Sequence, residues 1–388
     1  MDITIHPGKL RGNIRVIPSK SQAHRYLICA AFSDTQTTLI CPETNRDIEA
    51  TADCLNALGA TITRTQRGYR IIPIQQVPET AILNCCESGS TLRFMLPIAG
   101  ALGVDAIFQL EGRLPRRPLS PLWEEMERMG CRLSRPTENT IRCEGKLRAG
   151  AYSIDGSVSS QFITGLLFAL SLIGGNSTLA ITGKLESKPY IDMTNAALSL
   201  FGAPNYRTPG QIEVEGDWSN GAFFLAAKTM GSDLTVTNLN PDSVQGDRAA
   251  AQILAQLSEN IHIDASDIPD LVPILAVAAA HSHGAVFTNI RRLRLKESDR
   301  VATVIEMIRS LGGQADATED TLTVYGTGLT GGTVNSHNDH RIAMAAAIAA
   351  TVCSGTVTIL HAEAVNKSYP LFWEEYRKLG GNYEQYLR

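Results

Sequence analysis

The sequence predicts an α/β protein with two lobes, each built from three copies of one β-α-β-α-β-β unit. Three observations support this expectation. The chain has 388 residues, more than one hydrophobic core usually holds, so two domains are expected. Segments with the same order of elements recur six times along the whole length. One helix in every segment is apolar on all sides, which is typical of a buried helix.

Each copy opens with a polar stretch rich in Ser, Asp or Asn, which leads into the apolar helix. These helices are expected within residues 19–33, 87–103, 157–175, 217–232, 266–282 and 337–355. A short β-type run follows each of them, at 37–41, 105–112, 177–183, 233–239, 284–290 and 355–362. An amphipathic helix comes next, at 45–59, 116–130, 187–202, 243–257, 296–313 and 367–381. Five amphipathic helices end in Gly, at Gly59, Gly130, Gly202, Gly312 and Gly380, where a left-handed C-cap is expected.

Hairpin-like segments close the unit, most clearly at 61–73, 131–145 and 315–326. After Leu257 the chain has only "SENIHIDASDIPD" before the next apolar helix, which is too short for a hairpin, so we expect a truncated fourth copy. Composition changes little along the chain, so the repeat count places the domain boundary. We expect a first lobe of residues 14–213 and a second lobe of residues 1–13 and 214–388, with the opening strand crossing to the second lobe.

Composition excludes several functional classes. The net charge is −4 and the pI is about 6.1, so no basic field covers the surface to hold nucleic acid. The most apolar runs are far shorter than the roughly 20 residues that span a bilayer, and "MDITIHPGKL" at the start is not a leader. The eight cysteines include no C-x-x-C pair, which is the usage expected in a reducing cytoplasm. We therefore expect a cytoplasmic protein without a nucleic-acid or membrane partner.

Charged and hydroxyl side chains gather at the predicted N-terminal ends of the helices. Free backbone N–H groups and the helix dipole make such an end a natural anion site. Cations are disfavoured there by the dipole, so a compensating anion is one explanation for them. The residues that we single out are Lys20, Ser21, Arg25, Gly89, Arg117, Ser159, Ser160, Gln161, Ser187, Tyr190, Asp270, Lys296, Glu297, Arg300, Arg341 and Lys367. If both lobes direct these ends at a shared cleft, the site suits a substrate that carries phosphate and carboxylate groups.

Structural explanations compete with the functional one in each motif. Serines at helix starts are often ordinary caps, and "SKSQAHR" is alternatively a solvated face. In "LKESDR" the alternative is an exposed helix start with a Glu–Arg pair three residues apart. In "NDHR" either Asn338 or Asp339 is a candidate cap, whereas Arg341 would enter a buried helix and needs a ligand or an acidic neighbour.

Other short motifs fail their context tests. "GTGLTGG" at 326–332 has the spacing of a dinucleotide fingerprint, but no helix opens on it. "HSH" at 281–283 and "HNDH" at 337–340 lack an accompanying Cys or carboxylate set at zinc spacing. We therefore expect no metal site.

In these motifs the chain resembles the 5-enolpyruvylshikimate-3-phosphate synthase family over essentially its whole length. The motifs occur in this order: "SKSQAHR", "ESGSTLR", "RLPRRPL", "SSQF", "SKPYIDMT", "QGD", "DIPDLVP", "KESDR", "NDHRIAMA" and "NKSYP". The resemblance implies a two-lobed inverse α/β barrel, of the enolpyruvyl transferase type, that closes on substrate. It implies transfer of the enolpyruvyl group of phosphoenolpyruvate to the 5-hydroxyl of shikimate 3-phosphate, with release of phosphate and without a metal or organic cofactor. We expect a monomer.

The resemblance also implies a role for each site residue. Shikimate 3-phosphate would be held by Lys20, Ser21, Arg25, Ser159, Ser160, Gln161, Ser187, Tyr190, Asp270 and Lys296. Phosphoenolpyruvate would be held by Lys20, Gly89, Arg117, Gln161, Arg300, Arg341 and Lys367. Asp270 would accept the hydroxyl proton, Glu297 would protonate the methylene carbon, and Lys20 would reach both substrates. Two carboxylates in acid and base roles suit an addition step, and surrounding cations should lower the pKa of Asp270.

Two other functions remain open on this scaffold. One is the related transfer of enolpyruvyl to UDP-N-acetylglucosamine, although the loop "LEGRLPRRPLS" lacks the Cys usual in that enzyme. The other is a catalytically inactive anion-binding protein. The chain is also short for the family, and Arg292 stands where the familiar bacterial pattern has Asn, so a substrate contact from that position is left open.

Overall fold

The computed structural model describes residues 1–257 and 261–387 and divides the chain into two compact units. The first lobe is Pro18–Glu215, and the second lobe is Met1–Ile17 with Gly216–Arg388. The chain changes lobe between Ile17 and Pro18 rather than after residue 13. A boundary after residue 13 would divide strand β2 (Arg11–Arg15), whose five residues all pair with β13 (Asp233–Thr237) in the second lobe.

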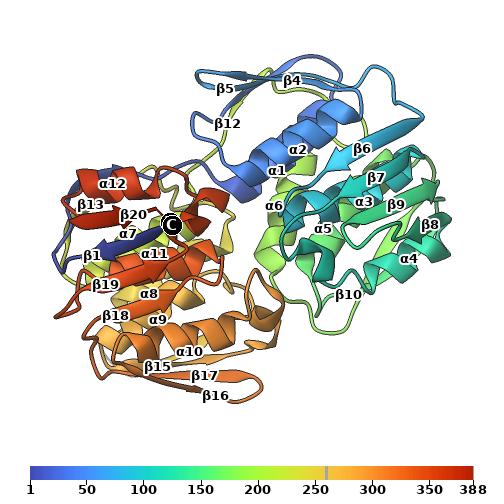
Figure 1. Ribbon diagram of the computed structural model, residues 1–388. Coiled ribbons are helices and arrows are strands. Elements are labelled where there is room, and N and C mark those ends of the chain that lie inside the picture. The colour runs from blue at the N-terminus through green and yellow to red at the C-terminus, as the bar shows by residue number, and fades with distance from the viewer. Residues whose placement is uncertain (258–260, 388) are drawn as a thin grey trace. The chain divides into compact units, whose positions relative to one another are not determined.

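The first lobe, blue to green in Figure 1, contains three sheets. Their strands, in spatial order, are β12 (Gln211–Glu213), β3 (Thr37–Ile40), β5 (Gly68–Ile72) and β4 (Thr61–Thr65); β6 (Thr80–Asn84), β7 (Asp105–Gln109), β9 (Thr140–Gly145) and β8 (Cys131–Ser134); and β10 (Ala151–Asp155) with β11 (Thr178–Thr182). The apolar helices are α1 (Lys20–Ala31), α3 (Gly89–Leu102) and α5 (Ser160–Leu172). The remaining helices are α2 (Arg46–Ala57), η1 (Leu114–Arg116), α4 (Leu122–Arg128) and α6 (Lys188–Leu200).

The second lobe repeats this plan with three further sheets. Their strands are β14 (Ile261–Asp264), β15 (Gly284–Thr288), β17 (Thr321–Tyr325) and β16 (Gln314–Ala317); β18 (Gly332–Asn335), β19 (Val357–Leu360), β1 (Asp2–Ile5) and β20 (Tyr383–Tyr386); and β13 with β2. The apolar helices are α7 (Trp218–Thr229), α9 (Val272–His281) and α11 (His340–Ala349). The others are η2 (Gly246–Arg248), α8 (Ala249–Ala255), η3 (Arg291–Leu295), α10 (Arg300–Ser310), η4 (Ala362–Lys367) and α12 (Phe372–Lys378).

Strand register explains where the helix starts lie. In the sheet of β6 and β7 the two strands run parallel, with Ile82 opposite Ile107, and α3 connects them. The same parallel pairing holds for β14 with β15 and for β18 with β19. A buried helix therefore begins just after the first strand of each pair ends, so its N-terminal residues lie at the carboxyl end of that strand.

Two units are shorter than the repeat predicted from the sequence. Between α6 and α7 the chain forms one strand, β12, which joins the sheet of β3 instead of making a hairpin. In the fourth unit α8 ends at Ala255, and β14 already pairs with β15 as the first strand of the next unit. Residues 258–260, part of the segment expected to be too short, lie outside the described residues. The left-handed C-caps are confirmed, since the five glycines have φ between +65° and +119°.

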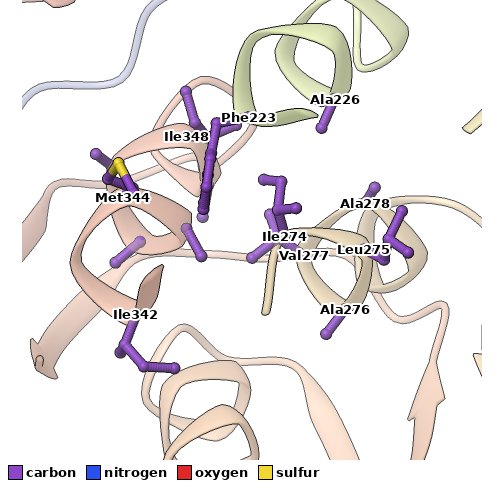
Figure 2. Packing of buried hydrophobic residues seen from close by; sticks show 14 of the residues in the cluster. Phe223, Ala226, Ile274, Leu275, Ala276, Val277, Ala278, Ile342, Met344 and Ile348 are labelled. Atoms are coloured by element: carbon purple, nitrogen blue, oxygen red, sulfur yellow. The ribbon is translucent and has the colours of Figure 1, made fainter. Parts of the chain in front are cut away.

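Three apolar helices pack against one another in the core of the second lobe, as Figure 2 shows. Phe223 of α7, Ile274 of α9 and Ile348 of α11 are all fully buried. Alanines such as Ala276 and Ala346 let the helices approach closely on several sides. This is the burial predicted for helices without a polar face. None of the helices within the described ranges is long and apolar enough to cross a membrane.

Helices α3 and α5 of the first lobe approach so closely that a side chain at Gly165 has no room. A Cβ atom at Gly165 would lie 2.1 Å from the carbonyl oxygen of Arg93 and 3.0 Å from Cγ of Pro97. Glycine at this position thus sets the separation of the two helices whose first turns carry Gly89 and Gln161.

We expect Gly165→Ala to lower the free energy of unfolding by about 2 kcal/mol or more, because backbone must move to accept the methyl group. Denaturant unfolding measures the effect. Gly174→Ala is the matched control, since a Cβ atom there meets nothing within 4 Å. Equal stability of the two variants would contradict this account of the helix contact.

Candidate active site

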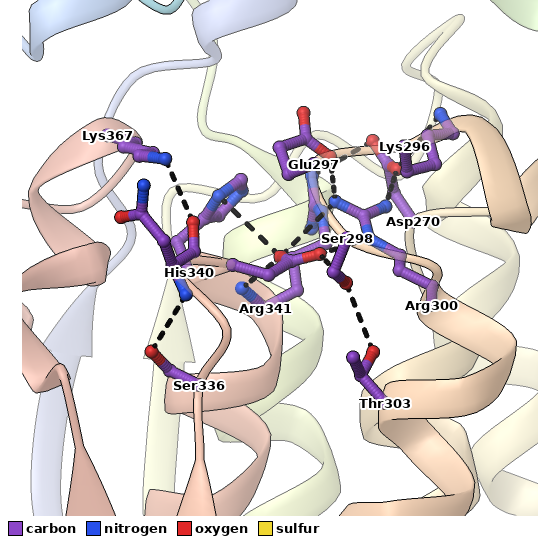
Figure 3. A network of polar contacts seen from close by, with 12 residues as sticks. Asp270, Lys296, Glu297, Ser298, Arg300, Thr303, Ser336, His340, Arg341 and Lys367 are labelled. Atoms are coloured by element: carbon purple, nitrogen blue, oxygen red, sulfur yellow. Dashed lines mark hydrogen bonds and ion pairs between the residues drawn. The ribbon is translucent and has the colours of Figure 1, made fainter. Parts of the chain in front are cut away.

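The second lobe holds a cluster of ion pairs at the N-terminal ends of α9, α10 and α11 (Figure 3). Asp270 lies two residues before α9 and accepts from three cations. Its Oδ1 lies 2.6 Å from Nη1 of Arg300 and 3.4 Å from Nζ of Lys296, and its Oδ2 lies 3.0 Å from Nη2 of Arg341. The ends of three separate units of the lobe are therefore joined through one carboxylate.

Arg300 is the most deeply buried member of this cluster, with 1% of its side chain exposed. Its Nε donates to Asp339 at 2.8 Å, and its Nη2 lies 2.5 Å from Glu297. Burial alone would lower the pKa of Arg300, but Asp339, Glu297 and Asp270 raise it well above its usual value. The Glu–Arg pair expected in "LKESDR" forms. The alternative of an exposed helix start is wrong, because Arg300 is enclosed.

The charge state of Asp270 follows from the same contacts. Burial favours its neutral form and by itself would raise its pKa, but Arg341, Lys296 and Arg300 together outweigh burial and hold the pKa well below its usual range. Asp270 is therefore a carboxylate at neutral pH, as the sequence predicted. Lys296 has the opposite conflict: burial lowers its pKa more than Asp270 raises it.

Acidic side chains cap the two helices that carry the arginines. Asp299 accepts a hydrogen bond from the backbone N–H of Ala302 in α10, and Asp339 accepts from that of Arg341 in α11. Asp339, rather than Asn338, is thus the cap in "NDHR". The predicted need of Arg341 for an acidic neighbour is met by Asp270. Nothing in the local sequence indicated that Asp339 also pairs with Arg300, because the two residues belong to different units.

Lys367 lies beside this cluster, at the end of η4. Its Nζ donates to the backbone oxygen of Asn338 at 2.9 Å, and Asn338 immediately precedes the capping residue Asp339. The six residues predicted in this lobe therefore meet at one place: five in direct ionic contact and Lys367 on the adjoining loop (Figure 3).

In the first lobe, Lys20 is the first residue of α1 and pairs with an acid that the sequence did not single out. Its Nζ lies 2.9 Å from Oδ2 of Asp47, in the first turn of α2, and each side chain is 16% exposed. The crowding of positive charge expected in "SKSQAHR" is thus relieved by a partner from the next helix. No spacing rule within the sequence connects these two residues.

Arg25 is buried without a carboxylate partner among the hydrogen bonds of the described residues. It donates to Oγ1 of Thr194 at 2.9 Å and to the backbone oxygens of Tyr190 and Ser21 at 2.7 and 2.6 Å. Burial lowers its pKa to about 10, which leaves it charged at neutral pH. With 2% of its surface exposed, Arg25 contradicts the solvated-face interpretation of the motif.

His24 is also buried, with 1% exposed, and it links three helices. Its Nδ1 lies 2.7 Å from Oγ1 of Thr51 in α2, which lies 2.8 Å from Oγ1 of Thr91 in α3. Burial, followed by repulsion from Lys20 and Arg25, holds the pKa of His24 well below its usual value. His24 is therefore a neutral imidazole.

Gly89 and Gln161 define the start of α3 and α5. A Cβ atom at Gly89 would lie 2.6 Å from Nη1 of both Arg117 and Arg93, so glycine gives two guanidinium groups access to this helix start. Gln161 donates from Nε2 to Oγ of Ser90 at 2.9 Å. The helix starts of α3 and α5 are thus tied to each other and to Arg117.

The three predicted serines occupy different positions. Ser159 caps α5, its Oγ accepting from the N–H of Gln161 at 3.3 Å, and Ser160 is buried behind it. Ser187 precedes α6 in the left-handed region, with φ of 56°. The N–H of Tyr190 donates to the carbonyl oxygen of Ser187 at 3.1 Å, and the carbonyl oxygen of Tyr190 accepts from Arg25.

The histidines of "HNDH" have roles in packing and ion pairing. Nε2 of His337 lies 2.9 Å from Glu306, and His340 is 2% exposed at the start of α11. Within the described part of the chain, no three His, Cys, Asp or Glu side chains gather in a way that could hold a metal ion.

The fold and these helix starts define an α/β protein with clustered cations and acids at the N-termini of its buried helices. The family model for EPSP synthase (3-phosphoshikimate 1-carboxyvinyltransferase) matches residues 5–265 and 257–376. The chain belongs to this family. The two matches overlap at residues 257–265, a range that includes β14.

Curated relatives agree over the whole length. The chain is 38% identical to the 3-phosphoshikimate 1-carboxyvinyltransferase of Clostridium kluyveri, over 99% of this chain and 98% of the relative. It is 36% identical to that of Clostridium beijerinckii, over 99% of each chain. The first alignment spans 424 positions, more than the 388 residues here, so the relative has residues without a counterpart in this chain.

Solved structures show the same fold. An EPSP synthase from Acinetobacter baumannii has a TM-score of 0.79 at 24% identity, covering 99% of both chains. A second structure of EPSP synthase from that organism has a TM-score of 0.80 at 22% identity, covering 100% of both chains.

The neutral state of His24 predicts a pH effect on stability. Below pH about 6.5 the unfolded chain binds a proton at this residue and the folded chain does not. The free energy of unfolding therefore decreases as the pH is lowered, by up to about 1.4 kcal/mol per pH unit. His24→Asn keeps a donor for Thr51 but cannot titrate, so we expect it to reduce the loss of stability between pH 7 and 5.5. Denaturant unfolding at each pH measures this. The exposed His262→Asn should keep the wild-type slope, and identical slopes for all three proteins would refute the prediction.

Proposed function

We propose that this chain transfers the enolpyruvyl group of phosphoenolpyruvate to the 5-hydroxyl of shikimate 3-phosphate and releases phosphate. The observation that carries the proposal is the contact of Asp270 with Arg300, Lys296 and Arg341 beside Glu297. A base and an acid among cations are the groups that an addition to an anionic enol ester requires. The membership of the chain in the EPSP synthase family supports the choice of substrates.

The residues that we propose to bind shikimate 3-phosphate are those that the family resemblance implies. They are Lys20, Ser21, Arg25, Ser159, Ser160, Gln161, Ser187, Tyr190, Asp270 and Lys296. Support comes from the geometry of the first lobe, where Arg25 stays charged while buried and where Ser159 and Ser160 stand at the start of α5. A helix start with a nearby buried cation favours a phosphate group.

The proposed site for phosphoenolpyruvate consists of Lys20, Gly89, Arg117, Gln161, Arg300, Arg341 and Lys367. The close approach of Arg117 to Gly89 supports this assignment, because a guanidinium group beside the N–H groups of a helix start suits a carboxylate or phosphate. Arg341, at the start of α11, supplies a second such group. Bringing two anions together against their repulsion is the first task of these cations.

The proposed chemistry is addition followed by elimination. Asp270 accepts the proton of the 5-hydroxyl while the hydroxyl oxygen bonds to the central carbon of phosphoenolpyruvate. Glu297 delivers a proton to the methylene carbon. The resulting tetrahedral adduct then breaks its bond to phosphate, which leaves, while Glu297, now a carboxylate, takes back a proton from the methyl group. The electron pair of that C–H bond restores the double bond. Asp270 begins as a carboxylate, as its low pKa requires. Lys20 stabilises charge on both substrates.

We also propose the finer architecture implied by the sequence: a two-lobed inverse α/β barrel whose six units derive from one repeat. Three sheets and three buried helices in each lobe support it. A monomer suffices for the proposed site because a single chain supplies every residue. The eight free cysteine thiols accord with a cytoplasmic location.

The proposed function predicts which substrate pair releases phosphate. Purified protein should release phosphate from phosphoenolpyruvate with shikimate 3-phosphate, and not with UDP-N-acetylglucosamine or without an acceptor. A phosphate-release assay with mass detection of the product separates the three cases. Release with the nucleotide sugar alone would identify the related transferase, and no release with any acceptor would favour an inactive anion-binding protein.

Asp270→Asn should lower kcat by about 10²-fold or more, because removal of a general base affects the transition state more than binding. The KM values should change by less than about fivefold, since the amide keeps an oxygen acceptor for Arg300. Steady-state kinetics measures both. Asp316→Asn, at an exposed ion pair with Arg309 in the same lobe, is the matched control. Wild-type turnover in the Asp270 variant would exclude it as the base.

A further inference from the structure

We propose that Ser336 is a positioning residue for Lys367, acting with Asp2 through a chain of hydrogen bonds. The proposal rests on the proposed function, in which Lys367 binds phosphoenolpyruvate. Ser336 follows β18 and lies outside every motif that the sequence analysis used. Its side chain is fully buried.

The hydrogen bonds run without a break from Asp2 to Lys367. The backbone N–H of His361 donates to Oδ1 of Asp2 at 3.1 Å, and Oγ of Ser336 donates to the carbonyl oxygen of His361 at 3.0 Å. The N–H of Asn338 donates to Oγ of Ser336 at 3.2 Å, and Nζ of Lys367 donates to the carbonyl oxygen of Asn338 at 2.9 Å. Figure 3 shows the last two contacts. Ser336 is the central link, because its hydroxyl both donates and accepts.

The backbone on either side of Ser336 needs such support. Of the seven non-glycine residues with positive φ in the described ranges, two belong to this chain of hydrogen bonds, Asn338 at 57° and His361 at 57°. A third, His337 at 51°, stands between Ser336 and Asn338. A left-handed conformation is unfavourable for residues with a side chain and persists only where the surroundings fix it. The orientation of the Asn338 carbonyl, which receives Lys367, depends directly on two of these residues.

Comparison among the units of the second lobe makes His361 unusual. Asn238 follows β13 and Asn289 follows β15, both left-handed, and His361 stands in the same position after β19. Asparagine tolerates this conformation, and the side chains of Asn238 and Asn289 hydrogen-bond to Val16 and Asp264. At His361 the hydrogen bonds are made instead by the backbone, whose N–H donates to Asp2 and whose carbonyl oxygen accepts from Ser336. In the unit that carries Lys367, backbone hydrogen bonds to Asp2 and Ser336 therefore replace the asparagine side-chain hydrogen bond at this turn.

Burial makes the Ser336 hydroxyl difficult to replace with water. Ser336→Ala would remove the acceptor for the N–H of Asn338 and the donor for the oxygen of His361 in an enclosed space. Lys367 would keep its side chain but lose a fixed partner. Ser336→Thr keeps the hydroxyl and is the conservative variant that should rescue function.

A double-mutant cycle tests the proposal. We would measure kcat/KM for phosphoenolpyruvate and KM for shikimate 3-phosphate in Ser336→Ala, Ser336→Thr, Lys367→Ala and the Ser336→Ala, Lys367→Ala double variant. Thr333→Ala, exposed on the same strand β18, is the matched control. Asp2→Ala and Asp2→Asn test the far end of the chain of hydrogen bonds, since only the amide retains Oδ1 as an acceptor.

We expect Ser336→Ala to lower kcat/KM for phosphoenolpyruvate about fivefold or more, with KM for shikimate 3-phosphate changed by less than about twofold. Ser336→Thr, Asp2→Asn and Thr333→Ala should stay within about twofold of the wild type. In the Lys367→Ala background the loss from Ser336→Ala should disappear, because residues that act through one another are not additive. An undiminished loss in that background, or equal losses for both substrates, would overturn the proposal.

A second measurement does not depend on activity. Reductive methylation of the native protein, quantified by peptide mass spectrometry, reports how firmly each amine is held. Ser336→Ala and Asp2→Ala should raise the methylation rate of Lys367 about twofold or more and leave that of Lys378, on α12, unchanged. Unchanged rates at Lys367 in both variants would overturn the proposal. If the wild type fails to release phosphate but Lys367 responds as expected, the proposed function fails and the positioning role stands.

Discussion

The guanidinium group of Arg300, enclosed with 1% of its surface exposed, is the constraint on which the second lobe depends. A buried charge is tolerated only with close opposite charges and full hydrogen bonding. Three carboxylates meet this requirement, and each comes from the start of a different helix or the turn before it. The requirement therefore sets the positions of Asp270, Glu297 and Asp339, and through them the directions in which α9, α10 and α11 begin.

The first lobe satisfies a similar constraint by other means. Arg25 is equally enclosed, but its partners are hydroxyl and carbonyl oxygens rather than carboxylates. Burial lowers the pKa of Arg25 because its neutral partners do not offset the loss of water, whereas three carboxylates raise the pKa of Arg300 despite its burial. In the proposed site, Arg25 therefore attracts an incoming anion more strongly than Arg300 does. Its surroundings suit a phosphate that contributes the missing negative charge, whereas Arg300 is already satisfied by the protein.

Local patterns predicted most of the fold and many of the charged residues at the helix starts, but not the partners of those residues. Apolar helices and glycine C-caps are determined within one turn of sequence, and the structure confirms both. The pairing of β12 with β3 depends on a strand far away in the sequence, so the missing hairpin of the third unit was not predictable. The cations were recognisable because they violate the dipole preference at helix starts. Asp47 and Ser336 were not, since acids and serines at such positions are ordinary and their partners lie on other helices.

The charge balance of the second lobe connects ligand binding to chemistry. In the lobe as described, three cations hold Asp270 ionised, which also makes it a weak base. An anionic ligand that binds Arg341 competes with Asp270 for its positive charge, and the proton affinity of Asp270 rises as this cation turns to the ligand. The carboxylate therefore becomes a better base only when the anion is present. Under the proposed mechanism, the same ion pairs that hold Asp270 ionised delay proton abstraction until the anionic substrate has bound.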